Sequence, residues 1–154
     1  MKSKIYRCFI GCAIAAMMVV ALGCDDSEDK KVSTLYDRLG GINAISLVVD
    51  KFLANVAADN MINQRFGPTV ANEARLKLLR NNLIDQICQG TGGPCQYKGK
   101  NMVEAHTGMN ITTAEFNALV GDLVAALDFY NVPTKEKEEL LGVLGPMQTN
   151  IVGK

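Results

Sequence analysis

The sequence contains no tryptophan and a single histidine, His106, in its 154 residues. One histidine excludes a metal site that needs two imidazole ligands, and it excludes a Ser-His-Asp triad that does not use His106. An excess of positive charge is also missing, since 16 lysine and arginine residues stand against 16 aspartate and glutamate residues. Nucleic-acid binding draws most of its affinity from basic side chains on phosphates, so the charge balance argues against that function.

No uncharged apolar run reaches the length of about 20 residues that a membrane-spanning helix needs. The longest covers residues 8–23, and three basic residues precede it. This pattern is typical of the hydrophobic region of a removable export signal. The run leads through small residues to Cys24, which a charged polar stretch over residues 25–31 follows.

The junction Ala21-Leu22-Gly23-Cys24 resembles a bacterial lipobox. The resemblance implies cleavage before Cys24, acylation of that cysteine as a membrane anchor, and a domain that faces the periplasm. Asp25, directly after it, resembles the signal that retains lipoproteins at the inner membrane. We therefore expect a lipoprotein signal peptide over residues 1–23 and an acidic tether over residues 24–33. The alternative is an uncleaved anchor helix.

Removal of the first 23 of 154 residues leaves a chain long enough for one hydrophobic core and too short for two comfortable domains. Three of the 16 basic residues leave with the signal, so the mature chain carries a small net negative charge. A composition of 48% hydrophobic and 21% charged residues is not that of a disordered protein. We expect one folded domain over residues 34–152.

Apolar residues recur at helical spacing from residue 34 onward, and no segment alternates strictly enough to predict a strand. Clusters of glycine, proline and asparagine divide the pattern. The expected fold class is therefore all-α, with a turn region over residues 60–72 and a kink at Gly145-Pro146. The expected helices span residues 34–39, 42–58, 73–89, 102–106, 113–130 and 135–152.

Four segments, in order and near the expected spacing, resemble group I truncated hemoglobins. They are Leu35-Tyr36-Asp37-Arg38-Leu39-Gly40-Gly41 with the Phe52 helix; Gly92-Gly93-Pro94 with Tyr97 and Gly99; Ala105-His106-x-Gly108-Met109-x-Ile111-Thr112; and Leu141 through Gly145-Pro146 to Ile151. The resemblance covers residues 34–152. It implies the two-over-two helical sandwich of a truncated globin, with heme b as the cofactor and a diatomic gas (O2, NO or CO) as the ligand.

By this resemblance His106 is the proximal ligand of the heme iron. Heme needs an axial ligand and an apolar slot, and a lone histidine can supply the first. Without a second histidine, ligation by two imidazoles is excluded, and the sixth position is open to a gas or water unless another side chain closes it. The other residues that match heme-contacting positions are Phe52, Leu53, Phe66, Leu76, Leu79, Arg80, Tyr97, Met102, Ile111, Phe116 and Leu119. For most of them ordinary core packing is the alternative.

The sequence departs from the family at two positions near the gas ligand. Family members usually have tyrosine after the phenylalanine of the second helix, and its hydroxyl donates to bound oxygen; here Phe52 is followed by Leu53, which cannot donate. Arg80 matches a position where relatives often have glutamine. If Arg80 points inward, it can donate to a bound ligand; otherwise it is a solvated arginine on a helix face. We expect weaker oxygen stabilisation than in tyrosine-bearing relatives.

Two cysteines, Cys88 and Cys95, lie outside the signal and the lipidation site, with six residues between them. In an oxidising compartment we expect them to form a disulfide. The alternatives are two reduced thiols or a metal site, and two cysteines alone make a poor metal site.

The resulting hypothesis is a membrane-tethered truncated hemoglobin that reversibly binds a diatomic gas and is not primarily an enzyme. NO dioxygenation would need stabilised oxygen, which Leu53 disfavours, and an unidentified reductase. Electron transfer or peroxidase-like chemistry is favoured if Arg80 lines the pocket or if a side chain ligates the sixth position of the iron. A heme-free helical lipoprotein that serves as an interaction module is an alternative of a different class.

Overall fold

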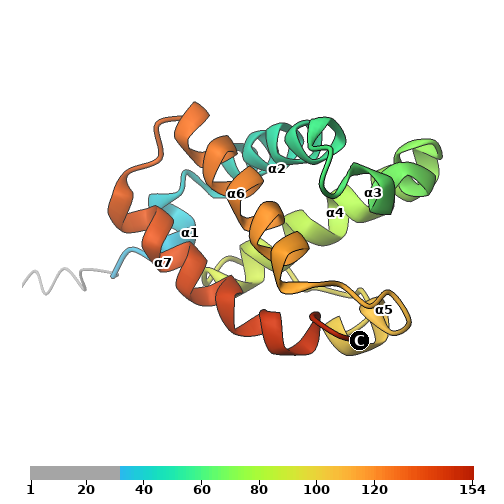
Figure 1. Ribbon diagram of the computed structural model, residues 1–154. Coiled ribbons are helices and arrows are strands. Elements are labelled where there is room, and N and C mark those ends of the chain that lie inside the picture. Colours follow the sequence, from blue (N-terminus) through green and yellow to red (C-terminus); the bar gives the residue numbers. More distant parts are fainter. Residues whose placement is uncertain (1–31) are drawn as a thin grey trace, which may run out of the picture. The chain divides into compact units, whose positions relative to one another are not determined.

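A computed structural model describes residues 32–154, so the predicted signal peptide, Cys24 and most of the tether lie outside the described residues. Within this part every regular element is helical, and the one β-bridge is an isolated parallel pairing of Ile111 with Val152. The prediction of an all-α fold is confirmed. The elements, drawn in Figure 1, are α1 (Leu35–Arg38), α2 (Gly41–Ala58), α3 (Asn63–Val70), α4 (Glu73–Gly90), α5 (Met102–His106), α6 (Thr113–Phe129), α7 (Thr134–Leu144) and the 3₁₀ helix η1 (Gly145–Asn150).

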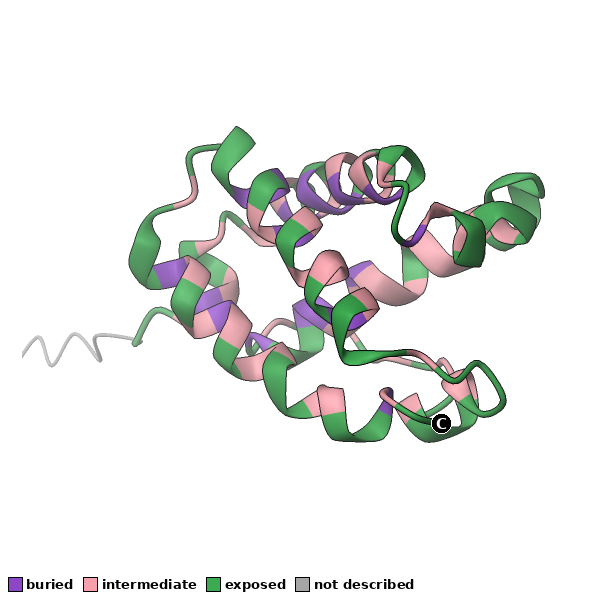
Figure 2. Ribbon diagram, viewed as in Figure 1, coloured by how far each residue is buried: buried purple, intermediate pink, exposed green. Residues whose placement is uncertain are grey.

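The core is centred on α2, which packs against both α4 and α6. One face of α2 is buried, and its members recur at helical spacing: Ile45, Val48, Val49, Phe52 and Val56. By length and composition α2 could cross a membrane, but this apolar face is part of the core. In Figure 2 buried residues lie on α2, α4, α6 and α7.

Helices α1 and α2 meet at two glycines, Gly40 and Gly41, whose φ angles are +90° and +72°. Glycine adopts this left-handed backbone without steric cost, so the chain can end one helix and begin the next without a longer loop. An ion pair between Arg38 and Glu136 (3.0 Å) ties α1 to α7. The first helix of the described domain is thereby held against α7.

The prediction of a turn region over residues 60–72 was wrong, because this segment contains the two-turn helix α3. Pro68 has no N–H to donate to the carbonyl four residues earlier, which makes a helix hard to predict there. A helix of eight residues loses only one bond in this way, and it ends two residues later, where the N–H of Ala71 donates to the carbonyl of Gly67 (2.9 Å). α3 has no fully buried residue.

The last predicted helix is in fact two elements. α7 ends at Leu144, and η1 follows from Gly145, with Pro146 in its first turn, where a missing N–H costs least. The helix also begins one residue earlier than expected, with Pro133 and not Thr134 at the N-cap. η1 packs against α5.

Candidate functional site

His106 is the last residue of α5, and its ring is half-buried. The helix begins at a side-chain cap, because Asn101 Oδ1 accepts a hydrogen bond from the N–H of Glu104 (3.0 Å). Nδ1 of His106 lies 2.7 Å from the carbonyl oxygen of Met102. A carbonyl oxygen can only accept, so Nδ1 is the donor of this hydrogen bond, and in a neutral ring with Nδ1 protonated the lone pair is on Nε2. This is the form in which an imidazole coordinates a metal, with its other nitrogen held by a backbone carbonyl.

The loop after His106 is held from two sides. From one side, Arg65 of α3 donates from Nη1 to the carbonyl of Met109 (2.7 Å). From the other, the N–H of Asn110 donates to the carbonyl of Lys154 (2.7 Å), and the N–H of Gly153 donates to the carbonyl of Ile111 (2.9 Å). These bonds fix the chain on the C-terminal side of α5, a helix too short to be stable alone.

The residues expected to contact heme differ in burial. Phe52 and Phe116 are buried, and Leu53, Phe66 and Leu119 are half-buried against the core. Leu76, Leu79, Met102 and Ile111 are also half-buried but lie outside the main core cluster of the described domain. The apolar surface of these four residues, from α4, α5 and the segment just before α6, is of the kind that a flat apolar cofactor would cover. In this respect the residues present fit a heme.

Leu53 lies on α2 and Arg80 on α4, two helices that pack against each other. Leu53 packs against the core through an aliphatic side chain with no hydrogen-bond donor. Arg80 forms a two-point ion pair with Asp50 of α2, from Nε to Oδ1 (2.5 Å) and from Nη2 to Oδ2 (2.8 Å). The hydrogen bond from Arg80 lowers the pKa of Asp50. The guanidinium of Arg80 is therefore engaged by a carboxylate between two helices.

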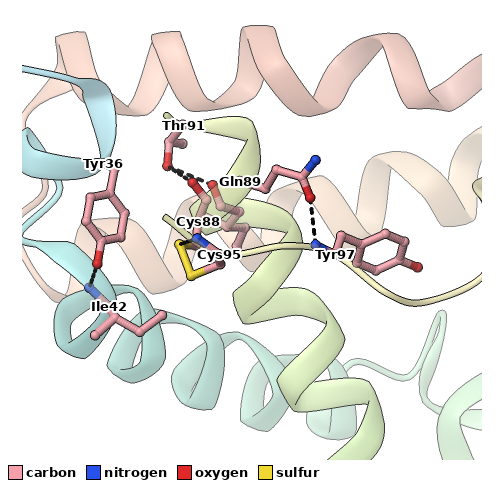
Figure 3. The surroundings of a disulfide bond; sticks show 8 residues. Tyr36, Ile42, Cys88, Gln89, Thr91, Cys95 and Tyr97 are labelled. Atoms are coloured by element: carbon pink, nitrogen blue, oxygen red, sulfur yellow. Dashed lines mark hydrogen bonds between the residues drawn. A yellow bond between two sulfur atoms is a disulfide. The ribbon is translucent and has the colours of Figure 1, made fainter. Parts of the chain in front are cut away.

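A disulfide joins Cys88, in the last turn of α4, to Cys95, in the loop before α5, with the Cα atoms 5.7 Å apart (Figure 3). Cys88 is completely buried. Two hydrogen bonds hold the same loop: the N–H of Tyr97 donates to Oε1 of Gln89 (2.6 Å), and the N–H of Tyr36 donates to the carbonyl of Thr91 (2.9 Å). The loop is thus bound to α4 and to α1.

A cavity of about 250 Å³ lies between the end of α4, this loop and η1. Of the residues expected to contact heme, only Tyr97 lines it, and burial raises the pKa of the Tyr97 phenol. Gln86 also lines the cavity, and its Nε2 lies 3.2 Å from Sδ of Met147 and 3.6 Å from Sδ of Met102. This amide therefore links α4 to α5 and η1.

The sequence did not point to Arg65, Asp50 or Gln86. Arg65 is next to the predicted heme contact Phe66, but its partners are 44 and 50 residues away. Asp50 is 30 residues from Arg80. Local pattern carries no signal for such pairs, because they depend on how distant helices cross.

Comparison with known proteins shows which family this chain belongs to. Residues 34–152 match the family model described as bacterial-like globin. The chain is 33% identical over 124 residues to the group 1 truncated hemoglobin of Tetrahymena pyriformis, covering 80% of this chain and 98% of that one. It is 32% identical over 119 residues to the group 1 truncated hemoglobin GlbN of Mycolicibacterium paratuberculosis, covering 77% and 84%.

Solved structures agree with these matches. The crystal structure of the Tetrahymena pyriformis truncated hemoglobin in its Fe(III) form superposes with a TM-score of 0.71 at 33% identity, over 79% of this chain and 99% of that one. The 2/2 hemoglobin of Synechococcus sp. PCC 7002, in the cyanomet state with covalently attached heme, gives a TM-score of 0.67 at 29% identity, over 76% and 94%. The prediction of a two-over-two truncated globin fold is confirmed.

Proposed function

The chain belongs to the bacterial-like globin family and is a heme-binding truncated hemoglobin that binds diatomic gases, and within that function we propose that His106 is the protein ligand of the iron. Bound heme supplies the iron at which the gas binds. The role of the protein chain is to hold the heme, to orient the side chain that binds the iron, and to set the polarity around the gas.

The bond between His106 and Met102 carries this proposal. With Nδ1 donating to the Met102 carbonyl at 2.7 Å, the ring is fixed in the tautomer whose Nε2 can coordinate. The chain offers no alternative imidazole, since His106 is its only histidine. The loop that follows His106 is held by Arg65 and by the C-terminal segment. The imidazole ring is therefore carried by a helix whose C-terminal side is fixed by contacts with distant parts of the chain.

At the two positions expected near the gas ligand, the residues favour reversible binding and do not supply a hydrogen bond that would stabilise bound oxygen. Leu53 brings no hydroxyl, and the guanidinium of Arg80 is paired with Asp50. A hydrogen bond to a bound ligand slows its release, so without such a donor we expect rapid oxygen dissociation. These features support reversible gas binding more than oxygen-dependent NO removal.

We also propose that the domain is anchored by a lipid at Cys24 and faces the periplasm from the inner membrane. The sequence of the first 31 residues is the main support. The disulfide between Cys88 and Cys95 is a second support, because such bonds persist in oxidising compartments such as the bacterial periplasm.

The test of the iron ligand is an absorption spectrum of the full-length protein, purified in detergent and loaded with heme. We expect a Soret band that shifts when CO is added to the ferrous protein. In His106→Gly the band should change or the heme should be lost, and added imidazole should restore it. A His106→Gly protein with an unchanged spectrum would contradict the assignment of the ligand.

The test of the anchor is independent of heme. In cells fed a labelled fatty acid, the wild-type chain should carry the label and fractionate with membranes, whereas Cys24→Ala should lose the label. Cys88→Ala, in a cysteine outside the lipobox, is the matched control and should keep the label. An unlabelled wild-type protein would contradict lipidation and favour the uncleaved anchor.

A further inference from the structure

Helix α5 has five residues, so its position is set mainly by what holds its two flanks. On the C-terminal flank the bonds are ordinary hydrogen bonds from Arg65 and the chain end. On the N-terminal flank the loop over residues 91–101 is bonded through Cys95 to Cys88 of α4, with only residues 96–101 between Cys95 and the start of α5.

The disulfide joins the end of α4 to this loop (Figure 3), which is closely packed there against Tyr36 and Cys88. The N–H of Cys95 donates to Sγ of Cys88 (3.3 Å), and the N–H of Gly93 donates to the carbonyl of Cys88 (2.8 Å). A Cβ added at Gly93 would lie 2.5 Å from the Tyr36 ring and 2.7 Å from Cys88 Sγ. The loop therefore has little room to shift while the bond is intact.

From Cys95 the constraint continues toward α5. The N–H of Tyr97 donates to Gln89 of α4 (2.6 Å), and the Tyr97 hydroxyl donates to the carbonyl of Lys100 (2.7 Å). The next residue, Asn101, is the side-chain cap of α5. A continuous set of contacts thus runs from the buried sulfur of Cys88 to the helix that ends in His106.

From this continuity we propose that the Cys88–Cys95 disulfide is a positioning element for the proximal side of the heme site, which holds α5 and its ligand His106 in place. The inference rests on the proposed role of His106. It predicts that loss of the bond weakens heme retention and alters the bond between His106 and iron, beyond its effect on overall stability.

The decisive variant is Cys95→Ala in the full-length protein. It removes the bond but leaves the buried Cys88 sulfur in its place. Cys88→Ala/Cys95→Ala is the second variant, in case a free thiol disturbs folding. Leu140→Ala is the control for stability, because Leu140 is buried in α7 beside Leu39 and Ile45 and belongs to neither the loop nor α5. Thermal unfolding ranks the three variants by stability loss.

Two measurements on the heme-loaded proteins then separate positioning from stability. The first is the rate of heme transfer to excess apomyoglobin, and the second is the iron–histidine stretching band of the ferrous form. In both cysteine variants we expect heme transfer roughly 5- to 50-fold faster than in the wild type and a shifted band. In Leu140→Ala we expect the wild-type band and a smaller change in transfer.

Three results would overturn the inference, and they differ from one another. If the cysteine variants match Leu140→Ala in both measurements, the disulfide only stabilises the fold. If the folded wild type reacts with a thiol-alkylating reagent at Cys88 or Cys95 before reduction, the bond does not form. If the wild type shows no band sensitive to His106→Gly, the proposed iron ligand itself is wrong.

Discussion

Arg65, on the short helix α3, donates a hydrogen bond from Nε to Oε1 of Glu115 across 2.7 Å and so ties α3 to the first turn of α6. Glu115 also caps α6. Its Oε2 accepts hydrogen bonds from the backbone N–H and from the hydroxyl of Thr112 (both 2.8 Å), which completes a capping box. One carboxylate therefore joins the helix that carries Phe66 to the segment that follows His106.

The first prediction concerns acid stability. The hydrogen bond from Arg65, followed by those from Thr112, lowers the pKa of Glu115 from 4.5 to about 2. A carboxyl whose pKa is lower in the folded state stabilises the fold above its unfolded pKa, and this contribution is lost as pH falls from about 4.5 to about 2. Glu115→Gln should therefore lower the thermal midpoint at pH 6, and the difference from the wild type should shrink toward pH 2.

Glu138→Gln, at an exposed position of α7, is the matched control and should leave the midpoint nearly unchanged throughout. Thermal unfolding followed by far-ultraviolet circular dichroism between pH 2 and pH 6 makes the measurement. A Glu115→Gln protein whose deficit stays constant with pH would show that the charge of this carboxyl is not what stabilises the loop.

The second prediction concerns the gas ligand. Leu53→Tyr restores the hydroxyl that tyrosine-bearing relatives have, and we expect oxygen to dissociate roughly 5- to 50-fold more slowly. Leu53→Phe adds the same ring without the hydroxyl and is the control. Stopped-flow displacement of oxygen by CO measures the rates. Equal slowing in both variants would assign the effect to size and not to the hydrogen bond.

The third prediction concerns Arg80. Because its guanidinium is paired with Asp50, Arg80→Gln should leave CO association and oxygen dissociation unchanged and lower the free energy of unfolding by about 0.5 kcal/mol. Asp50→Asn should lower it by a similar amount, and the double variant should lose less than the sum. A large change in oxygen dissociation in Arg80→Gln, but not in Asp50→Asn, would mean that Arg80 contacts the ligand.

The fourth prediction compares two glycines. A methyl group at Gly93 would lie 2.5 Å from the Tyr36 ring and 2.8 Å from the carbonyl oxygen of Cys88, so Gly93→Ala should lower the free energy of unfolding by about 2 kcal/mol or more. At Gly121, inside α6, nothing lies within 4 Å, and Gly121→Ala should raise it by about 0.5–1 kcal/mol. Urea unfolding measures whether each substitution raises or lowers the free energy of unfolding. A stable Gly93→Ala protein would show that the loop can move aside.

Much of the fold could be predicted from periodicity and caps alone. The bounds expected for α5 coincide with those observed, and α6 begins at the expected residue 113, because helix ends depend on neighbouring residues such as the Thr112 cap. The two-turn helix α3 was missed because Pro68 removes the hydrogen bond that a helix normally needs there. In each of these cases the outcome depended on residues a few positions apart.

The site was predicted less completely, for a different reason. The family resemblance pointed to His106, but the residues that hold its surroundings are far away in sequence. Arg65 reaches Met109 and Glu115, and Asp50 reaches Arg80, only because helices distant in sequence meet in the folded chain. A charged residue on a helix face does not reveal its partner until the crossing of the helices is known.

The hydrogen bonds between Asn110–Ile111 and Gly153–Lys154 have a practical consequence for work on this protein. Anything fused after Lys154 emerges beside the loop that follows His106. A polyhistidine purification tag at that end would bring foreign imidazoles close to His106, the proposed iron ligand, in a protein that otherwise has a single histidine. Affinity handles without histidine would keep the spectrum of the site attributable to its own ligand.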